Sequence, residues 1–156
     1  KVNPHVEFRL RKPKLFDDQH LGLELFAQLR STGGSPPWHW SLDVSSPERA
    51  ILETIDELPE TVSFSALDLM FENLGQLRPR LLTTLLKHCR RVKVKRLFFV
   101  YADKHQHGWR AHVDPTGVDL GAGDRAFTAG GRLHPTYRIT VPAELLPSRE
   151  GQSDGP

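Results

Sequence analysis

The stretch "RPRLLTTLLKHCRRVKVKRLFFVYADKHQHGW", residues 78–109, combines the clearest helical pattern of the chain with its densest run of positive charge. In its first half, four apolar residues recur at helical spacing behind a proline, which the first turn of a helix tolerates. These four are Leu82, Leu85, Leu86 and Cys89. The second half has apolar residues at both strand and helix spacing, and so short a run cannot be assigned from its period alone. The sequence therefore predicts one helix here and leaves the segment after Val92 open.

Two further helices are predicted before this stretch. In "SSPERAILETIDELP", residues 45–59, a serine can cap the first turn, Pro47 suits that turn, and apolar residues share one face until Pro59. "SALDLMFENL", residues 65–74, has the same spacing and is followed by a glycine, which commonly ends a helix. Three successive helices are therefore expected in the middle of the chain.

The two ends of the chain show strand patterns instead. "VEFRL" at residues 6–10 and "WSLDV" at residues 40–44 alternate apolar and polar residues, as half-buried strands do. "VDLGAGDRAF", residues 118–127, is typical of two short strands around a glycine turn, and "YRITVP", residues 137–142, alternates again. We expect an α+β fold in which three or four helices pack on a mixed sheet built from N- and C-terminal strands.

The length of 156 residues suits one domain, which would bury roughly two-thirds of the surface of its unfolded chain. We assign this single domain to residues 1–146. It divides into a strand-rich part at 1–44, a helical part at 45–109 and a second strand-rich part at 110–146. Residues 147–156, "PSREGQSDGP", have the composition of a disordered tail.

Composition also bears on the compartment. The single cysteine, Cys89, excludes an internal disulfide and fits a reducing environment. No apolar run approaches the ~20 residues of a membrane span, and the N-terminus has no signal-peptide core. We therefore expect a cytoplasmic protein without membrane contact. Because the chain begins at Lys1 and has Met70 as its only methionine, we also expect it to be part of a longer protein.

Charge is segregated along the chain although the net charge is only +2. Residues 48–72 are rich in acids, whereas residues 78–96 contain eight Lys or Arg and no acid. Within "KHCRRVKVKR", residues 87–96, the density of bases exceeds what favourable contacts at a helix end require. The run could contact nucleic-acid phosphates, or it could face the acidic helices of its own chain. The candidate nucleic-acid-binding residues are Arg90, Arg91, Lys93, Lys95 and Arg96.

Several enzyme classes are disfavoured, because the chain has no phosphate-binding G-K-[ST] loop, no complete nucleophile elbow and no H-E-x-x-H metal motif. One cluster of candidates remains in "YADKHQHGWRAH", where Asp103, His105 and His107, with His112 nearby, could hold a metal. That cluster supports an alternative function, a metal- or acid-dependent nuclease or phosphotransfer enzyme. Histidines near a helix end are more often simply solvent-exposed, so we favour a non-enzymatic protein without a cofactor.

Four segments together resemble the C-terminal region of AbiEi-type antitoxins from bacterial type IV toxin–antitoxin systems, which belong to abortive infection defence. They lie between Ser45 and Pro142 and occur in the order found in the family. They are "SSPERAILETIDELP", "LRPRLLTTLLKHCRRVKVKRLFFVYADKHQHGW", "VDLGAGDR" and "GGRLHPTYRITVP".

The resemblance implies that two domains of the full-length protein have different functions. An N-terminal winged helix-turn-helix, which this chain lacks, represses the operon, and the C-terminal domain counters a nucleotidyltransferase-fold toxin without forming a stable complex with it. The basic run would then contact operator DNA beside the winged helix, or the RNA on which such toxins act. A protein-interaction module, binding an acidic partner through the basic run, is a further alternative.

Overall fold

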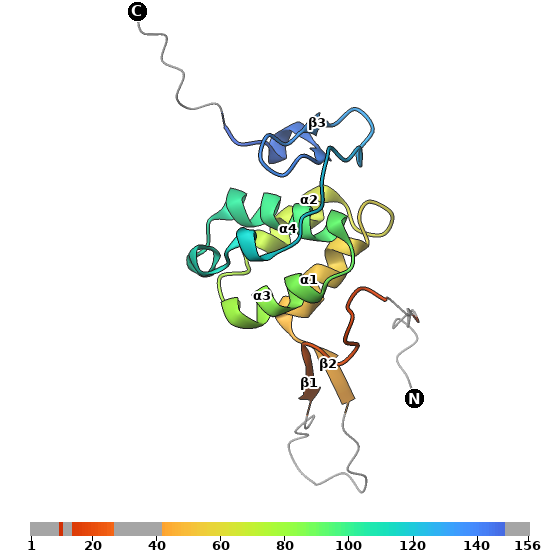
Figure 1. The fold of residues 1–156 in the computed structure, drawn as a ribbon, viewed down its shortest axis with the longest axis vertical. Helices are drawn as coiled ribbons and strands as arrows, with labels where there is room; N and C mark the ends of the chain where they lie inside the picture. Colours follow the sequence, from red (N-terminus) through yellow and green to blue (C-terminus); the bar gives the residue numbers. More distant parts are fainter. Residues whose placement is uncertain (1–9, 11–13, 27–41, 149–156) are drawn as a thin grey trace, which may run out of the picture.

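The computed structural model describes residues 10, 14–26 and 42–148. Four α-helices follow a β-hairpin, and short 3-10 helices and strands complete the chain (Figure 1). In chain order the elements are β1 (Leu23–Phe26), β2 (Leu42–Ser45), α1 (Pro47–Asp56), α2 (Phe64–Glu72), α3 (Pro79–His88), α4 (Val92–His105), η1 (Gly108–His112), η2 (Pro115–Gly117), β3 (Arg132–Leu133), β4 (Thr140–Val141) and η3 (Ala143–Leu145). The α+β prediction is confirmed, and the segment after Val92, which the sequence left open, is helix α4.

The strands form two separate antiparallel pairs, β1 with β2 and β3 with β4, in place of the one mixed sheet that the sequence predicted. The predicted hairpin at residues 118–127 is wrong: of this segment only Arg125 makes a bridge, with Ile139. Gly121 and Gly123 have φ values of 65° and 72°, which turn the chain out of the extended conformation. The predicted strand at residues 6–10 lies outside the described residues, apart from Leu10.

Helices α1 and α2 both begin at serine caps, of which the sequence predicted the one at α1. The Ser46 hydroxyl accepts a hydrogen bond from the Arg49 amide at 3.2 Å, and the Ser63 hydroxyl accepts one from the Ala66 amide at 3.1 Å. Helix α4 ends at Gln106, which adopts the left-handed conformation with φ 48°. The helix boundaries are thus set by local capping chemistry.

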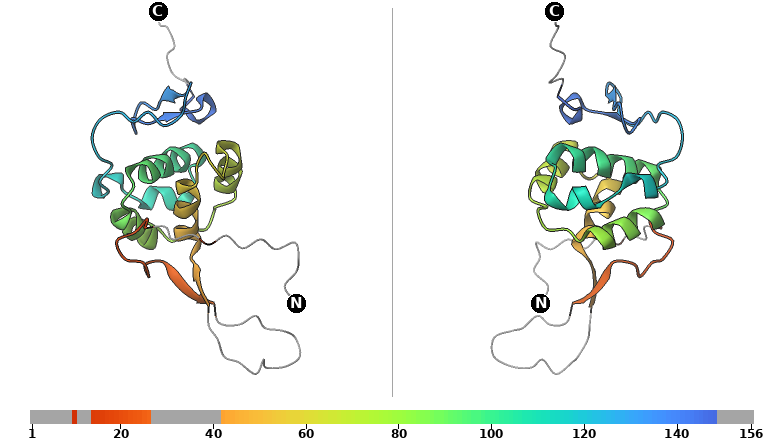
Figure 2. Two further views of the ribbon diagram at one scale, coloured as in Figure 1. Left: turned by 90° about the vertical axis from the view of Figure 1, so that its right-hand side faces the viewer. Right: turned by 60° about the vertical axis from the view of Figure 1, so that its left-hand side comes forward.

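Helix α4 is the centre of the molecule, because every residue from Val94 to Ala102 is buried. Figure 2 shows the helices as a body between two smaller parts, the β1–β2 hairpin and residues 118–146, which we call the C-terminal unit. The body packs α4 against α1 and α2, and α1 against α3. A helix that is enclosed on all sides loses the one-sided apolar pattern of a surface helix, which is why its period was ambiguous.

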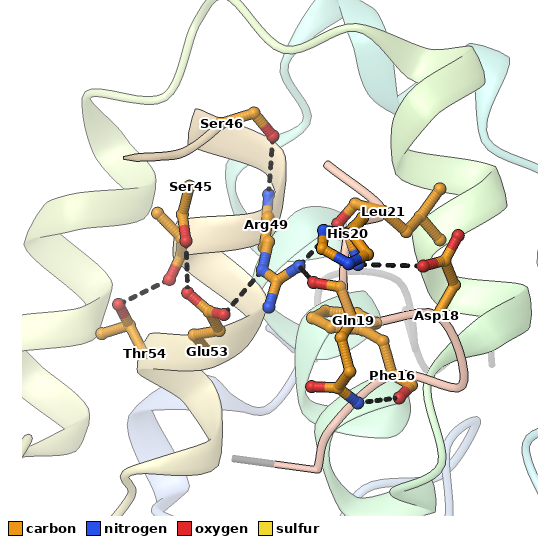
Figure 3. A network of polar contacts seen from close by, with 11 residues as sticks. Phe16, Asp18, Gln19, His20, Leu21, Ser45, Ser46, Arg49, Glu53 and Thr54 are labelled. Carbon is orange, nitrogen blue, oxygen red and sulfur yellow. Dashed lines mark hydrogen bonds and ion pairs between the residues drawn. The ribbon is translucent and has the colours of Figure 1, made fainter. Parts of the chain in front are cut away.

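Arg49 joins the hairpin to the helical body (Figure 3). Its Nε donates to Glu53 Oε1 at 2.7 Å, and one terminal nitrogen donates to the carbonyls of Gln19 and Leu21 at 2.7 and 2.8 Å. The guanidinium also lies 5.1 Å from the ring centroid of Phe16. One side chain of α1 thereby fixes the segment that leads into β1.

A second ion-pair network joins the hairpin, α1 and the start of α3. Glu48, only 1% exposed, accepts hydrogen bonds from the backbone amide, Nε and a terminal nitrogen of Arg78, at 2.7, 3.2 and 2.9 Å. Arg78 also pairs with Glu24 of β1. Burial opposes ionisation of Glu48, but the hydrogen bonds from Arg78 outweigh it and lower its pKa to about 2.

Replacing Glu48 by glutamine should lower the free energy of unfolding by about 1–3 kcal/mol, because the Arg78 donors lose a charged acceptor. The folded pKa lies below the ordinary value of 4.5, so the contribution of Glu48 is present above pH 4.5 and is lost as the pH falls toward 2. Urea unfolding of both proteins across this range should show a difference that shrinks in acid. Glu72→Gln, at an exposed position at the end of α2, is the matched control, and an equal loss in both variants would contradict the assignment.

Candidate nucleic-acid interface

The basic run begins at the end of α3 and continues into α4, and its five candidate residues differ sharply in exposure. The side chains of Arg90 and Arg91 are 51% and 54% exposed. Lys93 is partly buried, whereas Lys95 and Arg96 are only 5% and 3% exposed. The run is therefore not one continuous surface.

The two exposed arginines are each paired with an acid of their own chain. Arg90 Nε lies 2.6 Å from Asp17 Oδ1, and a terminal nitrogen of Arg91 lies 3.1 Å from Asp56 Oδ1 at the end of α1. The Arg90–Asp17 pair is exposed on both sides, and such pairs contribute little to stability and can exchange for a phosphate partner, whereas the Asp56 side chain that pairs with Arg91 is only 14% exposed. Both guanidinium groups therefore remain accessible to a polyanion.

Lys93 points inward and closes the C-terminal end of α1. Its ammonium donates to the backbone carbonyls of Asp56 at 3.2 Å and Leu58 at 3.1 Å, and it lies 4.8 Å from the ring centroid of Phe127. A cation at this place complements the negative end of the helix dipole. Burial lowers the pKa of Lys93. In this conformation the ammonium stabilises the fold by donating to these carbonyls.

Arg96 also points inward, toward the C-terminal unit. Its Nε donates to the carbonyl of Leu120, and one terminal nitrogen donates to the carbonyls of Gly123 and Arg138, each at 2.8 Å. Within the described part of the chain, neither Arg96 nor Lys95 has a carboxylate at ion-pair distance. The structure thus gives Arg96 a positioning role, and it leaves neither residue an exposed cation for a phosphate.

The outer face of α3 is a basic surface that the sequence reasoning missed. Arg80, Thr84, Lys87 and His88 are all exposed and recur at i, i+4, i+7 and i+8, so that they share one side of the helix. No ion pair reaches Arg80 or Lys87 from the residues that the structure describes. The signal was present in "RPRLLTTLLKH" as the polar positions between the leucines. We call these four residues the α3 basic face.

The candidate metal ligands Asp103, His105 and His107, on which the alternative enzymatic function depended, point to different partners. Asp103 binds Arg110 Nε at 2.6 Å and the Tyr137 hydroxyl. His105 Nε2 lies 2.7 Å from Asp68 Oδ1, and His107 Nε2 lies 2.6 Å from the carbonyl of Phe71. Across residues 14–26 and 42–148, no three His, Cys, Asp or Glu side chains are grouped to hold a metal ion.

The same histidines instead hold α2 against α4. The rings of His105, His107 and Trp109 stack in succession, with centroids 6.1 and 5.9 Å apart. His107 and Trp109 each donate to a carbonyl at the C-terminal end of α2, those of Phe71 and Leu74, both at 2.6 Å. The motif H-x-H-x-W therefore supplies donors to carbonyls at and just beyond the C-terminal end of a neighbouring helix.

The comparisons with known proteins identify the family of this chain. Residues 2–142 match a family model for transcriptional regulators that are antitoxins of type IV toxin–antitoxin systems. The chain belongs to that family, AbiEi_3, which is described as transcriptional regulator, AbiEi antitoxin, type IV TA system. No curated protein and no solved structure matches the chain. The resemblance seen in the sequence is confirmed, and it extends to residues before Ser45. Among the described helices, none is both long and apolar enough to cross a bilayer.

Neutral substitutions should separate the structural bases from the exposed ones. Arg96→Gln should lower the free energy of unfolding by about 2–4 kcal/mol, because three partly buried carbonyls lose a charged donor that is itself buried. Lys87→Gln, on the α3 basic face, should change it by no more than about 0.5 kcal/mol. Urea unfolding measures both, and a stable Arg96→Gln protein would contradict the inward role of this arginine.

Proposed function

We propose that this chain is the antitoxin domain of a type IV toxin–antitoxin system and counters a nucleotidyltransferase-like toxin. In the full-length protein it forms part of a transcriptional autorepressor that binds operator DNA. The observation that carries the proposal is the family match over residues 2–142, which covers almost all of the domain that we assign to residues 1–146. The domain works in the cytoplasm, without enzymatic activity and without a cofactor.

The proposed nucleic-acid contact lies on Arg90 and Arg91 together with the α3 basic face. Two observations support this surface. The guanidinium groups of Arg90 and Arg91 are half-exposed, and Arg80 and Lys87 of the α3 basic face are exposed and have no ion pair among the described residues. Clustered bases release counterions from a nucleic-acid backbone, which gives affinity that falls steeply with salt. Because phosphate contacts carry no sequence information, this surface suits operator DNA whose sequence is recognised by a separate DNA-binding domain, with RNA as the alternative ligand.

Growth rescue tests the antitoxin function. Bacteria expressing the cognate toxin should recover when they also express these 156 residues. The full-length protein is the positive control, and an empty vector is the negative control. Rescue by the full-length protein alone would show that residues outside this chain are required, and failure of both with confirmed expression would contradict the proposal. A stable complex between this chain and the toxin in a pull-down would favour the protein-interaction module instead.

Salt-dependent binding tests the nucleic-acid contact. The variant Arg80→Gln/Lys87→Gln/Arg90→Gln should bind operator DNA more weakly. It should also flatten the slope of log K against log salt by about one for each phosphate that the substituted side chains no longer reach. Fluorescence anisotropy at several salt concentrations measures this slope, on labelled operator DNA and on labelled RNA.

Arg132→Gln, at an exposed base of β3, is the matched control and should leave the slope unchanged. If the triple variant folds and binds both nucleic acids as the parent does, the proposed surface is wrong.

A further inference from the structure

The C-terminal unit lies along one stripe of α4, formed by Val92, Arg96, Phe99 and Asp103 at positions i, i+4, i+7 and i+11. Val92 meets the backbone of Gly121 so closely that an added Cβ would lie 3.1 Å from a Val92 methyl carbon. Arg96 donates to three carbonyls of the unit, as described above. Figures 1 and 2 show the unit as a separate layer beyond the helices, reached by the chain after η1.

The other two residues of the stripe, Phe99 and Asp103, both contact Tyr137 of the unit. Its ring stacks on Phe99 with centroids 5.6 Å apart, and its hydroxyl donates to Asp103. Burial raises the pKa of Tyr137 to about 12, and the bond to Asp103 acts in the same direction, so the hydroxyl keeps its proton at neutral pH. Elsewhere in the same interface the ring of Phe127 packs edge-on against Phe64 of α2, at 5.9 Å. The interface thus combines two aromatic pairs and polar bonds with buried aliphatic side chains of the unit, those of Ile139, Val141 and Leu145, which belong to the main hydrophobic core.

Two cations of the basic run lie beneath this unit, and within the described residues they donate hydrogen bonds only to neutral groups, although Asp56 and Glu60 attract Lys93 and Asp124 attracts Arg96 from a greater distance. Arg96 has three carbonyls, and Lys93 has two carbonyls and the ring of Phe127. Burial lowers the pKa of Arg96, and nearby Arg125 adds to the effect. Removing charge from water without a directly bonded opposite charge costs free energy that neutral acceptors only partly offset. A phosphate would be a stronger partner for either group.

We propose that the C-terminal unit is an autoinhibitory cover on the basic run. In the docked form it binds Arg96 through three carbonyls and covers Lys93 with the ring of Phe127. When it leaves α4, the freed Arg96 and the uncovered Lys93 join Arg90 and Arg91 in binding phosphates. This inference rests on the nucleic-acid contact of the proposed function. Nucleic acid binds the open form more tightly, because that form offers two more cations, and the bound population therefore shifts toward the open form.

Tyr137→Phe weakens the docked form without altering any of the four cations. Hydrogen exchange measured by mass spectrometry should accelerate in residues 118–146 while α1 and α3 stay protected. Affinity for labelled DNA or RNA should rise several-fold, and the slope of log K against log salt should steepen by up to about two, because two more cations reach phosphates. Adding Lys93→Gln to this variant should remove about half of the steepening.

Tyr101→Phe is the matched control, because Tyr101 is the chain's other tyrosine and also belongs to α4. Its hydroxyl donates to the carbonyl of Phe64 at 3.0 Å, on the side of α2. This variant loses one hydrogen bond as Tyr137→Phe does, but it should change neither exchange in the C-terminal unit nor the salt slope.

Each outcome of these measurements is informative. If Tyr137→Phe does not accelerate exchange, Tyr137→Ala/Phe127→Ala removes both aromatic pairs. If residues 118–146 of that double variant exchange only through global unfolding, the proposed autoinhibitory cover is wrong. Faster exchange with unchanged affinity and slope, in a protein that binds nucleic acid, overturns the cover and leaves the proposed function intact. Absence of binding by the parent and by the opened variants overturns the nucleic-acid contact itself.

Discussion

The structure depends on the enclosure of α4, a helix that is buried along nine consecutive residues and yet contains two buried bases, Lys95 and Arg96. Burial of a cation is tolerable only where oxygen atoms replace its water. The loop after η2 supplies these oxygens to Arg96, and the end of α1 supplies them to the neighbouring Lys93. The positions of α1 and of the C-terminal unit are therefore tied to the charges of one central helix.

The sequence predicts the parts of this fold whose pattern is local. The caps and one-sided stripes of α1, α2 and α3 are visible as serines, prolines and leucines at helical spacing. Helix α4 remained ambiguous because burial on all sides removes the one-sided period. The wrong prediction of a hairpin at residues 118–127 has a different cause. The glycines of this segment suggested a tight turn between strands, whereas the segment forms a loop whose carbonyls at Leu120 and Gly123 bind Arg96.

The candidate site was predictable only in part, for the same reason. A dense run of bases is typical of exposed charge, and of its candidate residues Arg90 and Arg91 are half-exposed. The inward direction of Arg96 depends on Arg138, 42 residues later, which no local pattern reveals. The histidines of "KHQHGW" show the same limit, since a metal site and a cap on the carbonyls of α2 require the same residue types and differ only in what lies opposite.

The acceptors of Arg96 are main-chain oxygens, and this has an evolutionary consequence. Every amino acid supplies such an oxygen, so replacing the side chain at Leu120 or Arg138 leaves the acceptor in place as long as the backbone path is kept. Divergence of the outer surface of the C-terminal unit is thus largely uncoupled from its attachment to α4. A lineage could exchange the residues that this unit presents to its surroundings, and so acquire a new specificity, while one arginine continues to hold the unit in place.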